Sequence, residues 1–92
     1  MHLQKACEIY ELALAQDADD THTQYQYAAL LDAYGETKRA DEHFRRAIEA
    51  DETHGYAIAQ YYQFLVRNGR TADFQALASR FEPMLRKMGV LS

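Results

Sequence analysis

The stretch 26–37, QYAALLDAYGET, decides the fold, because it returns 34 residues later as 60–71, QYYQFLVRNGRT. Gly35 and Gly69 occupy the same place in the two copies. A fixed lag of this size predicts stacked supersecondary units of one kind. Other identical pairs at this lag include Ala6 with Ala40, Glu8 with Glu42, Ala13 with Ala47, Asp17 with Asp51, Gln26 with Gln60, Tyr27 with Tyr61, Leu31 with Leu65, Thr37 with Thr71 and Arg46 with Arg80.

Residue usage favours a single all-α domain. The chain has 92 residues, which suits one small domain. It has only one proline and four glycines, fewer turn-forming residues than a β-rich protein usually needs. Good helix formers such as Ala, Leu, Glu, Gln and Arg are plentiful. We expect one domain over 1–92, made of the second helix of an incomplete repeat (1–20), a complete repeat (21–54) and a degenerate C-terminal repeat or cap (55–92).

Breaks in the apolar periodicity predict five helical segments. They are expected at about 3–16, from after Thr21 to Gly35, at about 37–50, at about 56–68, and from after Thr71 past Met84. Thr21 is predicted to cap the second segment, with Gln24 completing a weak capping box. Gly35 and Gly69 are expected to end helices in the left-handed conformation. Pro83 is expected to kink or divide the last segment, since an interior proline costs about 3 kcal/mol.

Each segment carries an apolar stripe that is expected to face the core, with residues recurring at steps of three and four. The short connections between segments predict antiparallel neighbours and therefore a helical solenoid. The expected core residues are Ala6, Ile9, Tyr10, Ala13 and Leu14, then Tyr27, Ala28, Leu30, Leu31 and Tyr34, then Ala40, Phe44, Ala47 and Ile48, then Ile58, Tyr61, Tyr62, Phe64 and Leu65, and finally Phe74, Leu77, Ala78, Phe81 and Met84.

This pattern resembles the tetratricopeptide repeat (TPR), a family with a 34-residue helix–turn–helix unit. The resemblance rests on Tyr27-Ala28 followed by Leu31, on Tyr61-Tyr62 followed by Leu65, and on Ala40, Phe44 and Ala47 with their counterparts Ala6, Tyr10 and Ala13. It implies an all-α, helical-repeat solenoid of antiparallel helix pairs with about five helices. The chain departs from the family at Gln24 and Ile58 in place of tryptophan, at Ala18 and Glu52 in place of proline, at Tyr62 in place of a small residue, and in the inverted order of Phe74, Ala78 and Phe81.

The resemblance implies a protein-interaction module, a scaffold or adaptor that binds a peptide or protein segment along a concave face and has no catalytic activity. The alternative left open is a structural spacer or self-assembly segment of a longer repeat array. The concave face is expected to carry His22, Tyr25, Gln26, Ala29, Asp32 and Ala33 from one helix and Tyr56, Ala59, Gln60, Gln63, Val66 and Arg67 from the next.

Charge and motifs argue against other classes of function. The net charge is −4, and the basic cluster at 38–46 contains carboxylates at helical pairing distance, such as Glu42 beside Arg46, so no nucleic-acid partner is expected. The histidines His2, His22, His43 and His54 show no zinc spacing, and no phosphate loop or nucleophile motif is present. We therefore expect no enzyme activity, metal or cofactor.

The ends of the chain suggest self-association. The first segment starts inside a repeat unit, so Ile9, Tyr10 and Leu14 are expected to leave part of an apolar stripe uncovered. The tail 84–91 is expected either to fold back as a cap or to form an oligomer contact. A single cysteine, Cys7, and the lack of a cationic leader or a long apolar run lead us to expect a cytoplasmic protein without a membrane partner.

Overall fold

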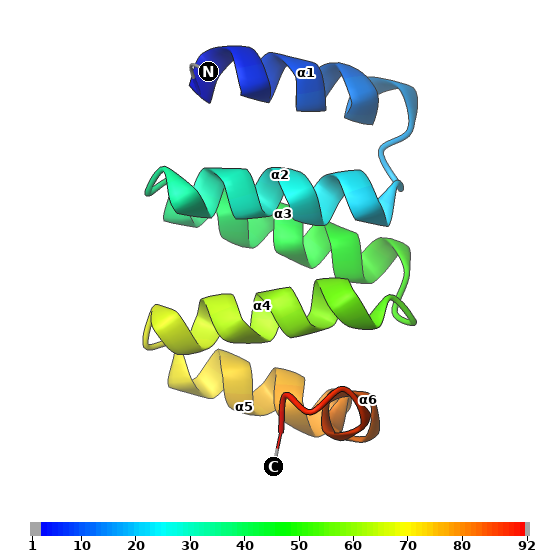
Figure 1. Ribbon diagram of the computed structural model, residues 1–92, viewed down its shortest axis with the longest axis vertical. Helices are drawn as coiled ribbons and strands as arrows, with labels where there is room; N and C mark the ends of the chain where they lie inside the picture. Colours follow the sequence, from blue (N-terminus) through cyan, green and yellow to red (C-terminus); the bar gives the residue numbers. More distant parts are fainter. Residues whose placement is uncertain (1–2, 92) are drawn as a thin grey trace.

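The computed structural model describes residues 3–91, and this part of the chain contains six α-helices and no strand. Each long helix runs antiparallel to the one before it, and the helices stack along the 38 Å long axis of the molecule (Figure 1). No helix in this range is long and apolar enough to cross a membrane. The helices are α1 (Leu3–Gln16), α2 (Thr21–Ala33), α3 (Thr37–Ala50), α4 (Gly55–Arg67), α5 (Thr71–Arg80) and α6 (Glu82–Lys87).

Helices α1 to α4 begin and end within two residues of the predicted segments, but the predicted cap of α2 is wrong. Asp20 caps the helix, because its Oδ1 atom accepts a hydrogen bond from the Thr23 backbone N–H at 3.2 Å. Thr21 is the first helical residue, and its hydroxyl donates instead to the Ala47 carbonyl at 3.0 Å. The buried Thr21 side chain therefore joins α2 to α3 and is not available to cap its own helix.

Pro83 divides the last predicted segment, so the structure has six helices where about five were expected. Helix α5 ends at Arg80, Phe81 interrupts the helix, and α6 begins at Glu82. Pro83 thus lies in the first turn of α6, where a helix needs no backbone N–H donor. The interrupted segment bends back because its proline is tolerated only at a helix start.

Gly35 and Gly69 end α2 and α4 in the left-handed conformation, with φ of 81° and 67°. At the first turn the Gly35 N–H donates to the Asp32 carbonyl at 3.0 Å and the Glu36 N–H to the Leu31 carbonyl at 2.9 Å. This pair of bonds is the Schellman motif. The second turn repeats it from Gly69 to Val66 and from Arg70 to Leu65.

Ring contacts between helices also recur at the 34-residue lag. Tyr10 of α1 stacks on Tyr27 of α2 with ring centroids 5.4 Å apart and an interplanar angle of 15°. The equivalent pair, Phe44 of α3 and Tyr61 of α4, has a centroid distance of 5.5 Å and an angle of 21°. The packing of one helix onto the next is therefore repeated along the stack.

The hydroxyls of Tyr27 and Tyr61 are each held between a carboxylate and an arginine. Tyr27 donates to Glu11 at 2.8 Å and accepts from Arg39 at 2.7 Å. Tyr61 donates to Asp41 at 2.7 Å and accepts from Arg45 at 3.1 Å. Burial, reinforced by the bond to Asp41, raises the pKa of Tyr61 to about 12. Both phenols stay protonated and fix the angle between helices.

Three residues of the predicted apolar stripes are exposed, and one of them, Ile9, was expected to be uncovered; Tyr10 and Leu14, expected to be uncovered with it, are partly buried. Tyr34 is 54% exposed because it follows the last residue of α2, where the helical periodicity has ended. Ile9 is 58% exposed and Ala13 is also exposed. Both lie on α1, which packs against α2, pairs its Glu11 with Arg39 of α3, and has no described helix packed on its outer side.

The C-terminal tail folds back onto the stack. Helix α6 contacts α4 and α5, and Leu85 is fully buried. A third Schellman turn follows, in which Gly89 has φ of 78° and the Val90 N–H donates to the Leu85 carbonyl at 2.9 Å. This end of the molecule is thereby closed.

We predict that Gly35→Ala and Gly69→Ala each lower the free energy of unfolding by about 1 kcal/mol, because a Cβ strains the left-handed backbone. The added atom meets nothing within 4 Å at either site, so the loss comes from the backbone alone. Urea denaturation followed by circular dichroism measures the change. Gly35→Asn is the matched control and should lose less, since asparagine tolerates this conformation. Equal losses for Ala and Asn would contradict the explanation.

Candidate functional site

The predicted partner-binding residues lie on α2 and α4, two helices that contact each other directly. They run in the same direction, so their N-terminal ends lie together at one side and their C-terminal ends at the other (Figure 1). We call this surface the α2–α4 face. Its exposed residues are His22, Gln26, Ala29, Ala33, Tyr56, Gln63, Val66 and Arg67, and its partly buried residues are Tyr25, Asp32 and Gln60.

Ala59 does not belong to this surface, and its assignment as a partner-binding residue is corrected. Its side chain is only 7% exposed and forms part of the core. The reason is that α4 packs against α2, α3, α5 and α6, so more of its surface is buried than one apolar stripe covers.

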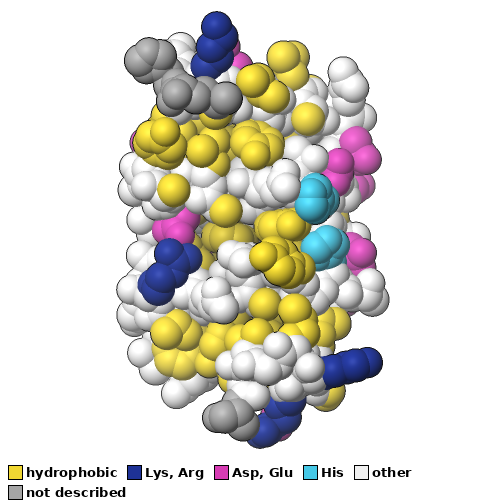
Figure 2. All heavy atoms as spheres, viewed as in Figure 1, with side chains coloured by type: hydrophobic (Ala, Val, Ile, Leu, Met, Phe, Trp, Pro, Cys, Tyr) yellow, Lys and Arg dark blue, Asp and Glu magenta, His cyan; other side chains and the backbone are white. Residues whose placement is uncertain are grey.

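An aromatic cluster, His22, Tyr25, His54 and Tyr56, covers the N-terminal ends of the two helices. The Tyr25 ring lies 5.6 Å from the Tyr56 ring, 5.4 Å from the His54 ring and 5.2 Å from the His22 ring. Figure 2 shows histidine side chains beside hydrophobic ones at this edge of the face. Tyr56 is 56% exposed, so much of the cluster is open to solvent.

Polar contacts hold the two imidazoles of the cluster in place. The Gln26 side-chain amide donates to His22 Nε2 at 3.0 Å. His54 caps α4, because its Nδ1 atom accepts the Ala57 backbone N–H at 3.2 Å.

The hydroxyl groups of the cluster are unengaged. Within residues 3–91, neither Tyr25 nor Tyr56 makes a side-chain hydrogen bond, in contrast to Tyr27 and Tyr61 in the core. Burial, followed by the charge of Tyr56, raises the pKa of Tyr25, which keeps this phenol protonated near neutral pH. Each hydroxyl can therefore donate a hydrogen bond to an incoming acceptor.

An ion pair joins the C-terminal ends of the same two helices. Arg67 Nη2 lies 2.9 Å from Asp32 Oδ2. Asp32 is partly buried, whereas Arg67 is well exposed. The guanidinium also lies in the last turn of α4, where a positive charge is favoured by the helix dipole. Arg67 keeps unused donors for a carboxylate or carbonyl on a partner.

A hollow of about 510 Å³ lies beside Arg67, between α4 and the C-terminal turn. Its chemistry is mixed, because Val66 and Met88 offer exposed apolar surface and Gln63 and Arg67 offer polar groups. Gln63, Val66 and Arg67 were predicted from the sequence to lie on this surface, but Met88, Gly89 and Val90 on the opposite wall of the hollow were not. The residues that line it are Tyr62, Gln63, Val66, Arg67, Met88, Gly89 and Val90.

Two groups of residues in the site were not predicted from the sequence. Met88 and Val90 reach α4 only because α6 folds back, and no repeat-based alignment places them there. His54 was expected to have an ordinary polar role in a turn. A usable signal existed, since His54 stands 34 residues after Asp20, and both residues cap the helix that follows.

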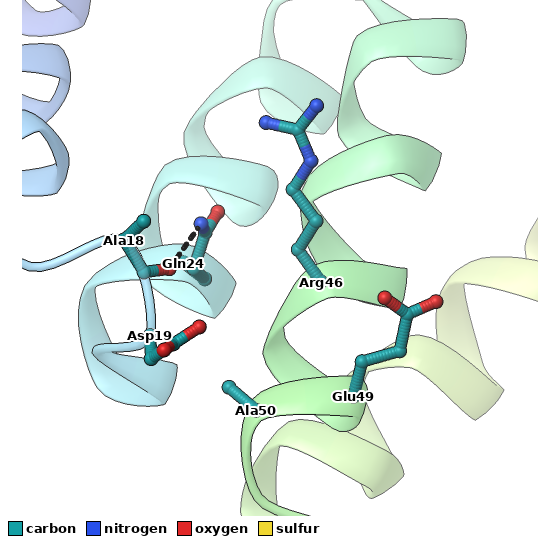
Figure 3. Close-up of a pocket in the computed structure, with 6 residues that line it drawn as sticks. All are labelled: Ala18, Asp19, Gln24, Arg46, Glu49 and Ala50. Atoms are coloured by element: carbon teal, nitrogen blue, oxygen red, sulfur yellow. Dashed lines mark hydrogen bonds between the residues drawn. The ribbon is translucent and has the colours of Figure 1, made fainter.

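A second hollow, of about 260 Å³, lies between the α1–α2 turn and α3 (Figure 3). Gln24 points into this region, but its amide already donates to the Ala18 carbonyl at 2.9 Å. The Gln24 Oε1 atom accepts from His43 Nδ1 at 2.7 Å. Gln24 is 2% exposed, and both its amide nitrogen and its amide oxygen have a partner, so this network is structural.

Metal and thiol chemistry have no assembled site in the described chain. Among residues 3–91, no three His, Cys, Asp or Glu side chains are placed to hold a metal ion. His2 lies outside the described residues. Cys7 is buried against the core, as expected of a small apolar side chain.

Comparison with known proteins gives no relative. No family model matches the chain, and no curated protein matches it. The function is therefore argued from the geometry of the α2–α4 face.

We predict that stability falls with acid through His43. Burial, followed by the charges of Arg46 and Arg39, lowers the pKa of this imidazole below its ordinary value. The unfolded chain then takes up a proton below about pH 6.5 while the folded chain does not, which favours unfolding. The free energy of unfolding should decrease as the pH falls from about 6.5 to the lower folded pKa.

Urea denaturation at pH 7 and pH 5 measures this decrease. His43→Gln is the test variant, because glutamine does not titrate and its amide can still donate to Gln24. The variant should show a smaller difference in stability between the two pH values. An unchanged difference would show that another group is responsible.

Proposed function

We propose that the chain is a TPR-like helical repeat that acts as a protein-interaction module, holding a peptide or protein segment along the α2–α4 face. The repeat assignment is supported by the contacts that recur at 34 residues, including the two stacked ring pairs and the two Schellman turns. The packing of α2 on α4 supports a layer of first helices, which is the surface that such arrays use.

The single observation that carries the binding role is the aromatic cluster with its unengaged tyrosine hydroxyls. Tyr25 and Tyr56 present apolar ring surface together with a hydrogen-bonding group, a combination enriched at protein interfaces. The Tyr25 ring contacts both the Tyr56 ring and the His54 ring, so its side chain has little freedom left to lose on binding. A preorganised aromatic pair of this kind gains affinity by reducing the entropic cost of association.

The dimensions of the face indicate what segment fits. Helices α2 and α4 each have 13 residues. At 1.5 Å per residue they are about 20 Å long, which matches about six residues of an extended chain. Such a segment reaches from the cluster at one end to Arg67 and the hollow at the other. We infer that it carries an apolar side chain for the hollow and an acceptor for Arg67.

The second candidate is a structural spacer, in which the same side chains only face solvent. It is favoured by the short α6 cap and by the open outer side of α1, features that concern the ends of the stack. In this case the α2–α4 face has no partner, and substitutions on this face do not change the binding of any peptide or protein. The two candidates therefore differ in a measurable way.

We predict that the double variant with Tyr25→Ala and Tyr56→Ala enriches no peptides from a displayed random library. Its dissociation constants for peptides selected on the wild-type protein should be at least tenfold higher. Truncating two aromatic anchors of an interface is expected to have an effect of this size. Peptides enriched on the wild-type protein are synthesised, and their dissociation constants are measured by calorimetry for both proteins.

The matched control is Tyr34→Ala, which removes a tyrosine of nearly equal exposure, 54% against 56% for Tyr56, from the end of α2. Peptide affinity should be unchanged in this variant. If no peptide is enriched, or if the control weakens binding as much as the double variant, the interaction role of this face is refuted and the spacer role stands.

A further inference from the structure

The outer side of α1 is apolar and uncovered. Among the described helices, α1 packs against α2 and is linked to α3 by the ion pair between Glu11 and Arg39. On the side away from α2, Ile9 is 58% exposed and Leu12 is 67% exposed. Figure 2 shows hydrophobic side chains on the outer surface over α1, at the top of the view. These two residues are the most exposed large hydrophobic side chains of the described chain.

The repeat relation identifies what this surface is built to contact. Residues 9 and 13 of α1 correspond at the 34-residue lag to His43 and Ala47 of α3. In α3 these positions are covered by α2, since His43 lies 4.5 Å from the Tyr27 ring and Ala47 is fully buried. Helix α1 therefore carries a helix-binding side that no helix of residues 3–91 occupies.

The opposite end of the molecule is closed and provides a contrast. Helix α6 buries Leu85 and exposes Glu82, Arg86 and Lys87 on its outer side. A charged outer side of this kind is typical of a terminal cap in a repeat stack. The apolar outer side of α1 is thus specific to the N-terminal end of the stack.

We propose that a second copy of this chain covers this surface, with the two α1 helices packed antiparallel about a twofold axis. With the axis between residues 10 and 11, Ile9 of each copy meets Leu12 of the other. The four side chains form one apolar centre, and the same patch serves both subunits, as a twofold interface requires. Ala13 lies beside this centre and allows close approach of the helices.

Charges at the two ends of α1 are complementary under the same symmetry. Lys5 lies one turn before Ile9 on the same side of the helix, and within residues 3–91 it makes no ion pair. The antiparallel arrangement brings it to the turn after α1 of the other copy, where Asp17 and Asp19 are exposed. A parallel arrangement would place like charges together, so the charges favour a second copy in antiparallel orientation.

The interface is limited to one helix pair and is smaller than the standard size for stable complexes, so we expect a dissociation constant on the order of micromolar or weaker. Sedimentation velocity over a concentration series that spans this range measures it. Ile9→Glu with Leu12→Glu should raise the dissociation constant at least tenfold. Val66→Glu, another exposed apolar residue replaced by glutamate, is the control and should leave dimerisation unchanged.

A charge exchange tests the orientation. Lys5→Glu should weaken the dimer, and Lys5→Glu with Asp19→Lys in the same chain should restore it, because each copy then presents the reversed pair. Asp19 is chosen because Asp17 Oδ1 accepts the Asp19 backbone N–H at 3.1 Å and shapes the turn. A monomer at every concentration, a dimer that survives the double glutamate variant, or no recovery in the exchanged chain would each overturn the proposal.

Discussion

The rest of the structure depends on the bond between the Leu31 carbonyl and the Glu36 N–H across Gly35, and on its repeat between Leu65 and Arg70 across Gly69. A helix end must satisfy its last carbonyls, and here it does so while reversing the chain within a few residues. Leu31 and Leu65 are also fully buried, so the residue that closes the turn is itself a core residue. The turn and the core therefore stabilise each other, and each helix is forced to pack antiparallel on its neighbour.

Because these turns repeat, α2 and α4 run in the same direction and lie side by side, and this places the candidate site. Their N-terminal ends bring Tyr25 next to His54 and Tyr56, and their C-terminal ends bring Asp32 next to Arg67. The two ends of the face consequently differ in chemistry, one aromatic and one charged. This difference gives the face a direction, which a bound segment would have to match.

Most of the fold could be predicted from the sequence, because helix starts and stops are set by local residues such as Gly35 and Pro83. Less of the site could be predicted, since exposure depends on how many neighbours a helix has. Ala59 is buried because α4 has four helical neighbours, and Met88 reaches α4 only through the fold of the tail. Thr21 failed as a cap for a similar reason: its hydroxyl donates to α3, a contact that no local pattern reveals.

The tyrosines show how one residue type supports both the fold and the site. A buried phenol needs hydrogen-bond partners, and Tyr27 and Tyr61 obtain them from charged side chains that also tie successive helices together. Tyr25 and Tyr56 lie on the same two helices but on the outer side, where their rings contact each other and their hydroxyls have no side-chain partner. The buried pair makes the scaffold rigid enough to hold the exposed pair at a fixed separation. The outward-facing ring cluster on α2 and α4 therefore comes from the same helix stack that builds the core.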